Sequence, residues 1–227
     1  MSKRKRTKTA FEVHRLSDAA ADPTVAAETI EAYIRIFNAA GADEWNESWT
    51  EAQVRRKLFE ETAPEADRCC LTLWRFGGQV AGLSLALLCE PLDSLTVRDL
   101  PPSFQGRQHL EGFRKHLSWI AGPKAKLVVY RELGIIPEYR GGLEPIIGLV
   151  IEPLSRARRA GANFGCFWTS RRSRLYPLMV GYGLRLIYDF HDPDDHVFMG
   201  DDLKNGWRRF RTAPAVARDL IAERLKS

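Results

Sequence analysis

The sequence LVVYRELGIIPEYRGG, residues 127–142, decides the fold that we expect for this chain. Its apolar, β-branched first half predicts a buried strand that ends at a proline. Arg140, Gly141 and Gly142 then form a turn, and Glu144-Pro145 opens a helix with apolar residues at helical spacing. The N-terminus of a helix holds anions well, and glycine lets the backbone approach them, although Gly-Gly pairs more often form plain turns. The spacing therefore predicts a strand-turn-helix unit that could hold a phosphate.

Residues 133–141, LGIIPEYRG, resemble the strand-to-helix crossing of the GNAT superfamily of acyl-CoA N-acyltransferases. In that family an apolar strand runs into Pro-Glu-Tyr-Arg-Gly and then into a loop that binds pyrophosphate, with the pattern Arg/Gln-x-x-Gly-x-Gly/Ala. The chain matches through Gly141 and then departs from the pattern, because Leu143 and Pro145 stand at the two glycine positions. A loop shifted onto Gly141 and Gly142 would be the substitute.

The resemblance implies acetyl-CoA or another acyl-CoA as co-substrate. Its thioester would lie where the central strand and the next parallel strand splay apart, with its carbonyl polarised by backbone groups of Ile135 and Ile136. The side chains of these two residues would be ordinary core. The other implied cofactor contacts lie in the turn and at the cleft mouth: Arg140, Gly141, Gly142, Leu143 and Arg171. For Arg171, a solvated basic loop is the competing reading. No metal is expected, because the five histidines lack ligand spacing.

Two residues are candidates for acid–base catalysis. Glu132, on the central strand, could take the proton from the amine nucleophile; the alternative is a surface-facing carboxylate paired with Arg131 or another cation. Relatives that the chain resembles protonate the leaving thiolate with a tyrosine in Phe-Tyr-x-x-Leu-Gly-Phe. That position falls on Met179, which has no proton to donate. Tyr176, one helical turn earlier, is the preferred substitute, Tyr182 is the other choice, and plain packing competes with both.

Composition indicates an ordinary globular protein of 227 residues, 44% hydrophobic and 28% charged, without an apolar run that could cross a bilayer. Five of its 34 Lys and Arg residues lie in the first eight positions, which leaves 29 basic against 29 acidic residues. We expect a disordered basic tail over residues 1–10, one GNAT-like domain over 11–211 with an insertion at 90–125, and a C-terminal helix over 212–227. Four cysteines without paired or metal-ligand spacing indicate reduced thiols in a cytoplasmic protein.

The predicted fold is α/β (α+β), a mixed central sheet flanked by helices. The resemblance implies that two parallel strands of this sheet splay apart. Strands are expected at 11–16, 70–76, 79–89, 127–136, 164–170, 184–190 and 196–199. Helices are expected from Pro23 toward a stop at Gly41 and at 50–59, 108–119, 144–160, 173–182 and 213–225. Pro153 should kink the helix at 144–160 or end it early.

The resemblance therefore implies an N-acyltransferase that moves an acyl group, expected to be acetyl, from acyl-CoA to an amine of a small molecule or peptide. One alternative is an N-acyl amino acid or acyl-homoserine-lactone synthase, which shares the fold and uses acyl carrier protein; arginines between 156 and 174 would suit that acidic partner. A second alternative is a non-catalytic binding module of the same fold. A nucleic-acid acceptor rests only on the basic tail. No membrane partner is expected, and a homodimer is compatible with each of these readings.

Overall fold

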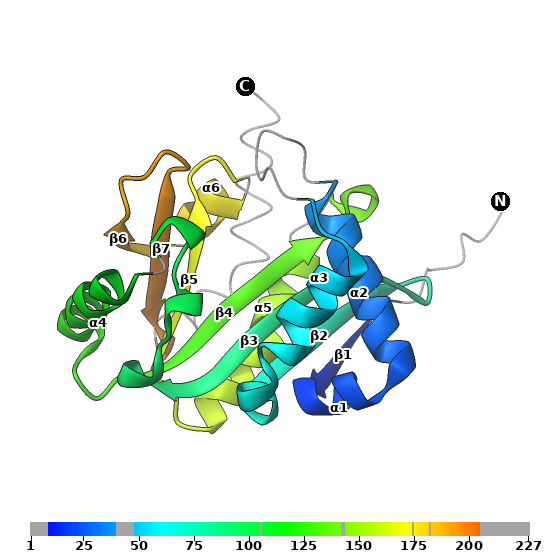
Figure 1. The fold of residues 1–227 in the computed structure, drawn as a ribbon, viewed down its shortest axis with the longest axis horizontal. Helices are drawn as coiled ribbons and strands as arrows, with labels where there is room; N and C mark the ends of the chain where they lie inside the picture. Colours follow the sequence, from blue (N-terminus) through cyan, green and yellow to red (C-terminus); the bar gives the residue numbers. More distant parts are fainter. Residues whose placement is uncertain are drawn as a thin grey trace, which may run out of the picture. The chain divides into compact units, whose positions relative to one another are not determined.

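The computed structural model describes residues 9–39, 48–104, 106–141, 144–173, 175–181 and 183–204. The predicted C-terminal helix and all but the end of the predicted basic tail therefore lie outside the described residues. Seven strands form a mixed sheet in the order β1-β2-β3-β4-β5-β7-β6 (Figure 1), which confirms the predicted fold class. Within the described part of the chain, no helix is both long and apolar enough to span a bilayer.

The bounds of the elements follow the sequence patterns closely. The strands are β1 Thr9–Arg15, β2 Cys69–Phe76, β3 Gln79–Pro91, β4 Lys126–Ile135, β5 Phe164–Ser170, β6 Arg185–Asp189 and β7 His196–Asp202. The helices are α1 Leu16–Ala21, α2 Pro23–Phe37, α3 Glu51–Arg55 with a π-helical continuation Arg56–Glu60, α4 Arg107–Ala121, α5 Glu144–Arg159 and α6 Leu175–Gly181. The helix predicted toward Gly41 thus ends at Phe37, and residues 40–47 lie outside the described part.

The chain divides into two compact units, and the first comprises the described residues up to Leu85 together with Glu132–Glu152. Its strands β1 and β2 pair antiparallel. Helix α2 begins at Pro23 because the side chain of Asp22 accepts hydrogen bonds from two N–H groups of the first turn. Helix α3 begins with the predicted capping box of Thr50.

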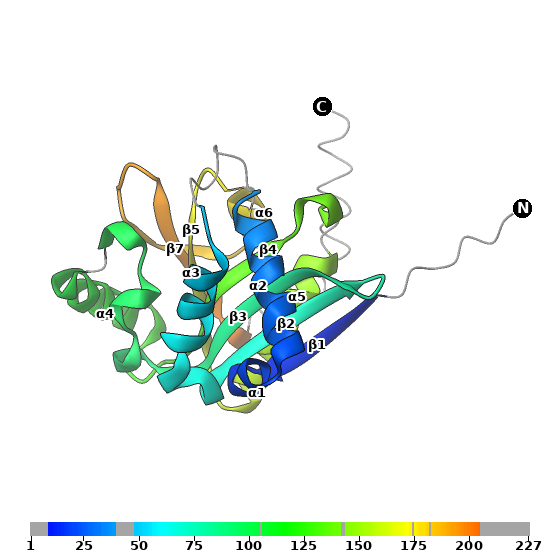
Figure 2. The same ribbon diagram turned by 45° about the vertical axis from the view of Figure 1, so that its right-hand side comes forward.

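Two glycines bring the helices of this unit close to its strands. A β-carbon on Gly134 of β4 would lie 2.3 Å from Cγ2 of Ile36 in α2. A β-carbon on Gly148 of α5 would lie 2.1 Å from the Phe11 ring of β1. Side chains cannot overlap at these distances, so glycine allows both close approaches. In Figures 1 and 2, α2 and α3 lie on one face of these strands and α5 lies on the other.

Helix α5 continues past Pro153 to Arg159. Of the two predicted outcomes, an early end at this proline is therefore wrong. Proline has no N–H, so the carbonyl four residues earlier, that of Leu149, loses its helical partner. The hydroxyl of Ser84 in β3 donates a hydrogen bond to this carbonyl at 2.7 Å, and Ser84 is fully buried. A strand side chain thus satisfies the polar group that the proline leaves unpaired within the helix.

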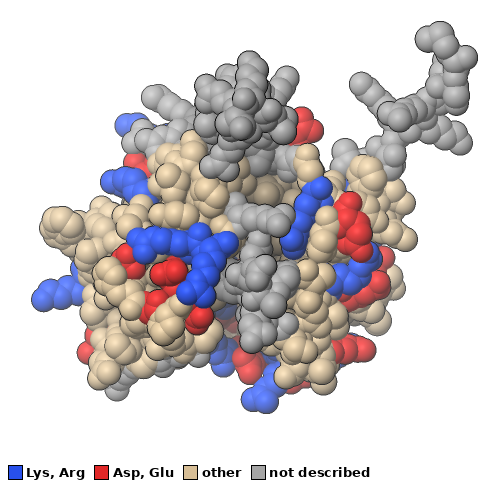
Figure 3. All heavy atoms as spheres, turned by 90° about the horizontal axis from the view of Figure 1, so that it is seen from above, with Lys and Arg blue, Asp and Glu red and all other residues tan. Residues whose placement is uncertain are grey.

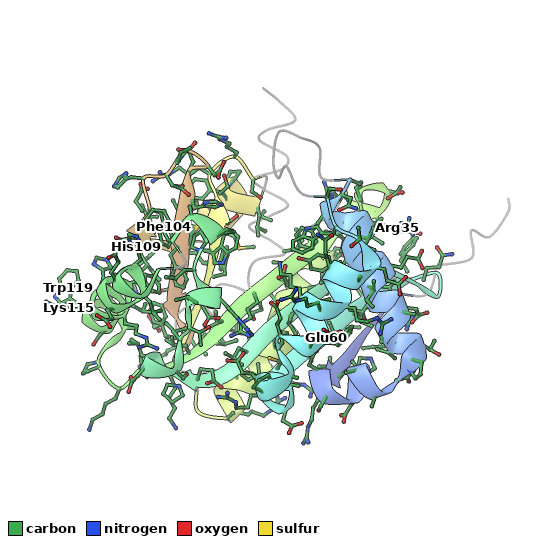
Figure 4. The ribbon with its side chains drawn as sticks, viewed as in Figure 1. Arg35, Glu60, Phe104, His109, Lys115 and Trp119 are labelled. Atoms are coloured by element: carbon green, nitrogen blue, oxygen red, sulfur yellow. The ribbon has the colours of Figure 1, made fainter. Side chains whose placement is uncertain are left out.

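The second unit comprises Ala86–Arg131 and the described residues from Pro153 onward. Its strand β5 pairs antiparallel with β7 along its whole length, and β6 and β7 form the predicted closing hairpin. The predicted helix of the insertion is present as α4. The buried Phe113 ring of α4 lies 4.5 Å from the Phe198 ring of β7, so the helix covers this strand. Figure 4 shows Lys115 and Trp119 on the outer side of α4.

A buried ion pair ties the insertion to β4 inside the second unit. Arg131 Nε lies 2.9 Å from Asp99 Oδ1, and both side chains are almost fully shielded from solvent. The other carboxylate oxygen of Asp99 accepts hydrogen bonds from the N–H and hydroxyl of Thr96. Buried charges need such partners, because an isolated one would be strongly destabilising.

In the second unit, β4 runs parallel to β5, as the strand-helix-strand pattern predicts. Their pairing covers three positions only, from Leu127 opposite Phe164 to Val129 opposite Cys166. Both strands then continue, β4 through Arg131 within this unit and β5 through Ser170. The predicted splay of the parallel strands is therefore present.

Candidate active site

The carboxylate of Glu132 lies in a cluster of polar and aromatic side chains in the first unit. Lys57 Nζ lies 2.8 Å from one carboxylate oxygen, and the Tyr33 hydroxyl donates a hydrogen bond of 3.2 Å to the other. Lys57 Nζ also donates to the Tyr33 hydroxyl at 2.7 Å. The Glu132 side chain is only 10% exposed and Tyr33 is fully buried, whereas the Lys57 side chain is 35% exposed. The cluster therefore contains a carboxylate that is shielded from solvent, and the lysine beside it is its more exposed member.

An aromatic wall completes this cluster. Lys57 Nζ lies 4.6 Å from the ring centre of Trp49 and 5.3 Å from that of Tyr33, at distances where an ammonium is attracted to a π face. Two reciprocal hydrogen bonds hold Trp49 in place: its N–H donates to the Asn38 side chain at 2.7 Å, and its carbonyl accepts from that side chain at 2.9 Å. The Trp49 ring meets Tyr33 edge to face.

The alternative predicted for Glu132, a surface-facing carboxylate paired with Arg131, is wrong in its exposure, because the side chain is only 10% exposed, and in its first partner. Arg131 pairs with Asp99, and Glu132 pairs with Lys57 instead. Successive residues of a strand point to opposite faces of the sheet, so Arg131 and Glu132 cannot readily face each other. Lys57 is the other cation that the alternative allowed.

The strand end that should contact the thioester is occupied by contacts within the first unit. The N–H of Ile136 donates to the carbonyl of Ala81 at 2.9 Å, and the carbonyl of Ile135 accepts from Arg140 Nε at 2.9 Å. The side chains of Ile135 and Ile136 are buried. The two groups are thus engaged in holding the strand end and the turn that follows it.

The turn after β4 is exposed and held at its start by an ion pair. Arg35 of α2 lies 3.3 Å from the carboxylate of Glu138. Hydrogen bonds from the backbone N–H of Glu138 and from Arg35 lower the pKa of this carboxyl. Arg140 and Gly141 are exposed beyond it, and Gly142 and Leu143 lie outside the described residues.

The second unit carries the other predicted site residues, Arg171 and Tyr176. Arg171 lies 2.5 Å from the Asp189 carboxylate, and its pKa is raised by this hydrogen bond and by another to the Tyr176 hydroxyl. Tyr176 is partly exposed near the start of α6, whereas Met179, at the position of the family tyrosine, is buried. Arg174 and Tyr182 lie outside the described residues.

The two arginines after β5 that the structure describes are paired with acidic side chains rather than grouped alone. Arg171 contacts Asp189, and Arg172 Nε lies 3.3 Å from the Asp195 carboxylate. On the face drawn in Figure 3, basic and acidic side chains likewise lie next to one another. Charge compensation of this kind weakens a long-range attraction to an acidic partner.

A polar cluster orders the loop between β6 and β7. Asp192 lies 2.6 Å from His196 Nδ1 and accepts a 2.6 Å hydrogen bond from the hydroxyl of Ser103. Asp192, Asp194 and His196 bring ligand-type atoms within 4.8 Å of one another, so they are the group of described residues that could hold a metal ion. The sequence does not predict this cluster, because Ser103 is distant along the chain and the residues at 192–196 show only the pattern of a turn.

No protein-family model matches the chain. No curated protein sequence matches it either. Among solved structures, FeeM, an N-acyl amino acid synthase from uncultured soil microbes, is similar with a TM-score of 0.55 and 13% identity, over 92% of this chain and 97% of that one. The PaiA N-acetyltransferase from Thermoplasma acidophilum, in complex with coenzyme A, matches with a TM-score of 0.52 and 13% identity, over 85% and 99%.

An uncharacterised protein from Bacillus halodurans also matches, with a TM-score of 0.52 and 12% identity, over 91% of this chain and 90% of that one. At such identities the likeness shows the fold alone. The chain has the fold of the GNAT N-acyltransferases, as the resemblance at residues 133–141 implies. The proteins of similar fold thus include an N-acetyltransferase and an N-acyl amino acid synthase.

Proposed function

We propose that the protein is an N-acyltransferase that moves an acyl group, which we expect to be acetyl, from the thioester of acyl-CoA to an amine. The observation that carries this proposal is the early end of the pairing between β4 and β5 in the second unit, after Val129 and Cys166. A strand whose neighbour turns away gives an extended, amide-bearing chain such as pantetheine a place to lie. The coenzyme A complex of a protein with the same fold supports the choice of donor.

Glu132 is the residue proposed to take the proton from the amine. Its carboxylate is shielded, yet it already lies 2.8 Å from an ammonium group, that of Lys57. A carboxylate within hydrogen-bond distance of an ammonium has the geometry that proton transfer requires. Tyr176, beside Arg171 in the second unit, is proposed to protonate the leaving thiolate. Exposed Arg140 and Gly141, with Gly142 and Leu143, are proposed to meet the phosphates.

The catalytic contribution of these groups would be modest compared with positioning. Holding an amine and a thioester in contact converts a bimolecular reaction into one within a complex, which supplies much of the acceleration. The engaged N–H of Ile136 gives no additional polarisation unless its bond to Ala81 opens. Most of the acceleration of acyl transfer is therefore expected from positioning of the bound substrates and from Glu132.

The test is release of free thiol from acetyl-CoA in the presence of a panel of primary amines. The proposal expects thiol release that depends on the amine, together with an N-acetylated product identified by mass spectrometry. Absence of turnover with every acyl-CoA, together with no heat of acyl-CoA binding in calorimetry, would instead support a non-catalytic module of the same fold.

A second candidate is an N-acyl amino acid synthase that takes its acyl group from acyl carrier protein. The likeness to FeeM over 97% of that chain favours it, as does an insertion whose helix α4 lies next to β7. The pairing of Arg171 and Arg172 with aspartates argues against a strongly basic docking surface there. Turnover with matched acyl-CoA and acyl carrier protein donors separates the two candidates.

A further inference from the structure

Lys57 is bound within the first unit in the way that a protein binds a ligand ammonium. Its Nζ contacts a carboxylate oxygen of Glu132 at 2.8 Å and the Tyr33 hydroxyl at 2.7 Å, and it faces the Trp49 ring at 4.6 Å. A carboxylate, a hydroxyl acceptor and an aromatic face are the groups that recognise a primary ammonium in a shielded site.

We infer that Tyr33, Trp49 and Glu132 form a binding site for the primary ammonium group of the acceptor, and that Lys57 fills this site in the free protein. The inference rests on the proposed function in identifying the ligand as the acceptor substrate. Binding of an ammonium group at this site can be tested without catalysis. It assigns the acceptor to the class of unbranched primary alkylamines, since the group now held is the end of an unbranched alkyl chain. Lys57 is then an internal competitor that an acceptor must displace.

The burial of the cluster supports displacement rather than a permanent structural role. Tyr33 is fully buried and the Glu132 side chain is 10% exposed, so both walls are fixed inside the unit. The Lys57 side chain is 35% exposed and reaches the carboxylate from solvent. A flexible lysine can leave such a site by rotating about its own bonds, whereas the walls remain in place. Trp49 is fixed in turn by its two hydrogen bonds to Asn38.

Replacement of Lys57 by alanine tests the site directly, because the atoms removed are those of n-propylamine. We expect n-propylammonium to raise the Tm of Lys57→Ala by several degrees at saturation, since a ligand that binds only the folded state stabilises the folded protein. The Tm shift caused by neutral n-propanol or by branched tert-butylammonium should be about tenfold smaller at equal concentration and ionic strength. Lys57→Met, which refills the space with an uncharged chain, should show no specific response to n-propylammonium.

An equal response of Lys57→Ala to all three compounds, or none to n-propylammonium, would overturn the inference. If Lys57→Ala does not fold, Trp49→Leu in the otherwise unchanged protein replaces it. That variant should raise KM for the amine about tenfold and leave KM for acyl-CoA unchanged. A Trp49→Leu protein with an unchanged amine KM would then reject the site.

The two proposals fail in distinguishable ways. Specific binding of n-propylammonium to Lys57→Ala without any acyl transfer would keep the ammonium site and reject the proposed function. Acyl transfer by the wild-type protein, combined with no specific amine response in Lys57→Ala, would keep the enzyme and reject the site. If both stand, Lys57→Ala should acylate n-propylamine with a lower KM than the wild-type protein does, because the internal competitor is gone.

Discussion

The pairing of Glu132 with Lys57 shows what a single strand position contributes to the candidate site. The strand stretch predicts where Glu132 lies, and the alternation of strand side chains argues against Arg131 as its partner. Lys57 lies in the π-helical continuation of α3 and belongs to no sequence motif, so its contact with the carboxylate depends on helix packing. The sequence therefore predicts the position of the candidate base Glu132 but not its partner Lys57.

Replacing Glu132 by glutamine should lower kcat/KM for acyl transfer by about two to four orders of magnitude, because the amide cannot accept the amine proton. The measurement is the amine-dependent rate of thiol release, with Tm recorded to confirm folding. Glu60→Gln, the same change at an exposed glutamate of the same unit, is the matched control and should retain the wild-type rate. Retention of full activity in Glu132→Gln would remove this residue from the mechanism.

Gly134 is a second position where one atom decides the packing. Its replacement by alanine would place a β-carbon 2.3 Å from Cγ2 of Ile36, and this buried side chain of α2 would have to move. The free energy of unfolding should fall by about 1–3 kcal/mol, measured by urea denaturation. Gly112→Ala, where nothing lies within 4 Å of the added atom, should leave stability unchanged or raise it slightly. Equal effects of the two changes would contradict this account.

At the scale of elements, most strands and helices were predictable because their patterns are local. The capping box at Thr50, the Asp22-Pro23 start and the Gly77-Gly78 turn each fix a boundary by chemistry within four residues. For α5 the sequence predicts a helix over 144–160 but leaves open whether Pro153 kinks it or ends it early. The outcome depends on Ser84, which lies on a strand far away in sequence.

Replacing Ser84 by alanine should lower the free energy of unfolding by about 1–3 kcal/mol, because the buried carbonyl of Leu149 loses its hydrogen bond. The same change in a Pro153→Ala background should cost less, since an N–H at position 153 can then reach that carbonyl. Urea denaturation of the four proteins gives the coupling between the two positions. Strictly additive effects would show that Ser84 does not compensate for the proline.

The loop between β6 and β7 should make the second unit sensitive to acid. Burial alone raises the pKa of Asp192, but hydrogen bonds from Ser103 and His196 lower it by more, so its pKa lies below its ordinary value. A carboxyl whose pKa is lower in the folded state stabilises the protein above the unfolded-state pKa, about 3.9, and loses this effect as the pH falls through the folded value.

The free energy of unfolding of the wild-type protein should therefore fall more steeply below about pH 5 than that of Asp192→Asn, and the two should converge in strong acid. Urea denaturation between neutral pH and about pH 3 measures this difference. Asp93→Asn, at an exposed position of the same unit, is the control and should follow the wild-type curve. Parallel curves for the wild type and Asp192→Asn would reject the role of this carboxylate.

For the whole molecule, the sequence predicted a mixed sheet with one parallel crossover, and the structure confirms it. The prediction succeeded because the strand-turn-helix stretch has a regular apolar pattern and resembles a known strand-to-helix crossing at residues 133–141. The ammonium site proposed around Glu132 could not be predicted, since its residues come from α2, from the segment before α3 and from the π-helical continuation of α3. Each of these lies in the first unit, whereas Tyr176 and Arg171 lie in the second.

The central claim is that an acyl-CoA donor binds where β5 leaves β4. Hydrogen exchange with and without acetyl-CoA tests it most directly in the second unit. The account predicts slower exchange of amides in Tyr130–Arg131 and in Phe167–Ser170, the segments beyond the last β4–β5 pair, with no change in α4. Unchanged exchange in both segments at saturating acetyl-CoA would contradict the account.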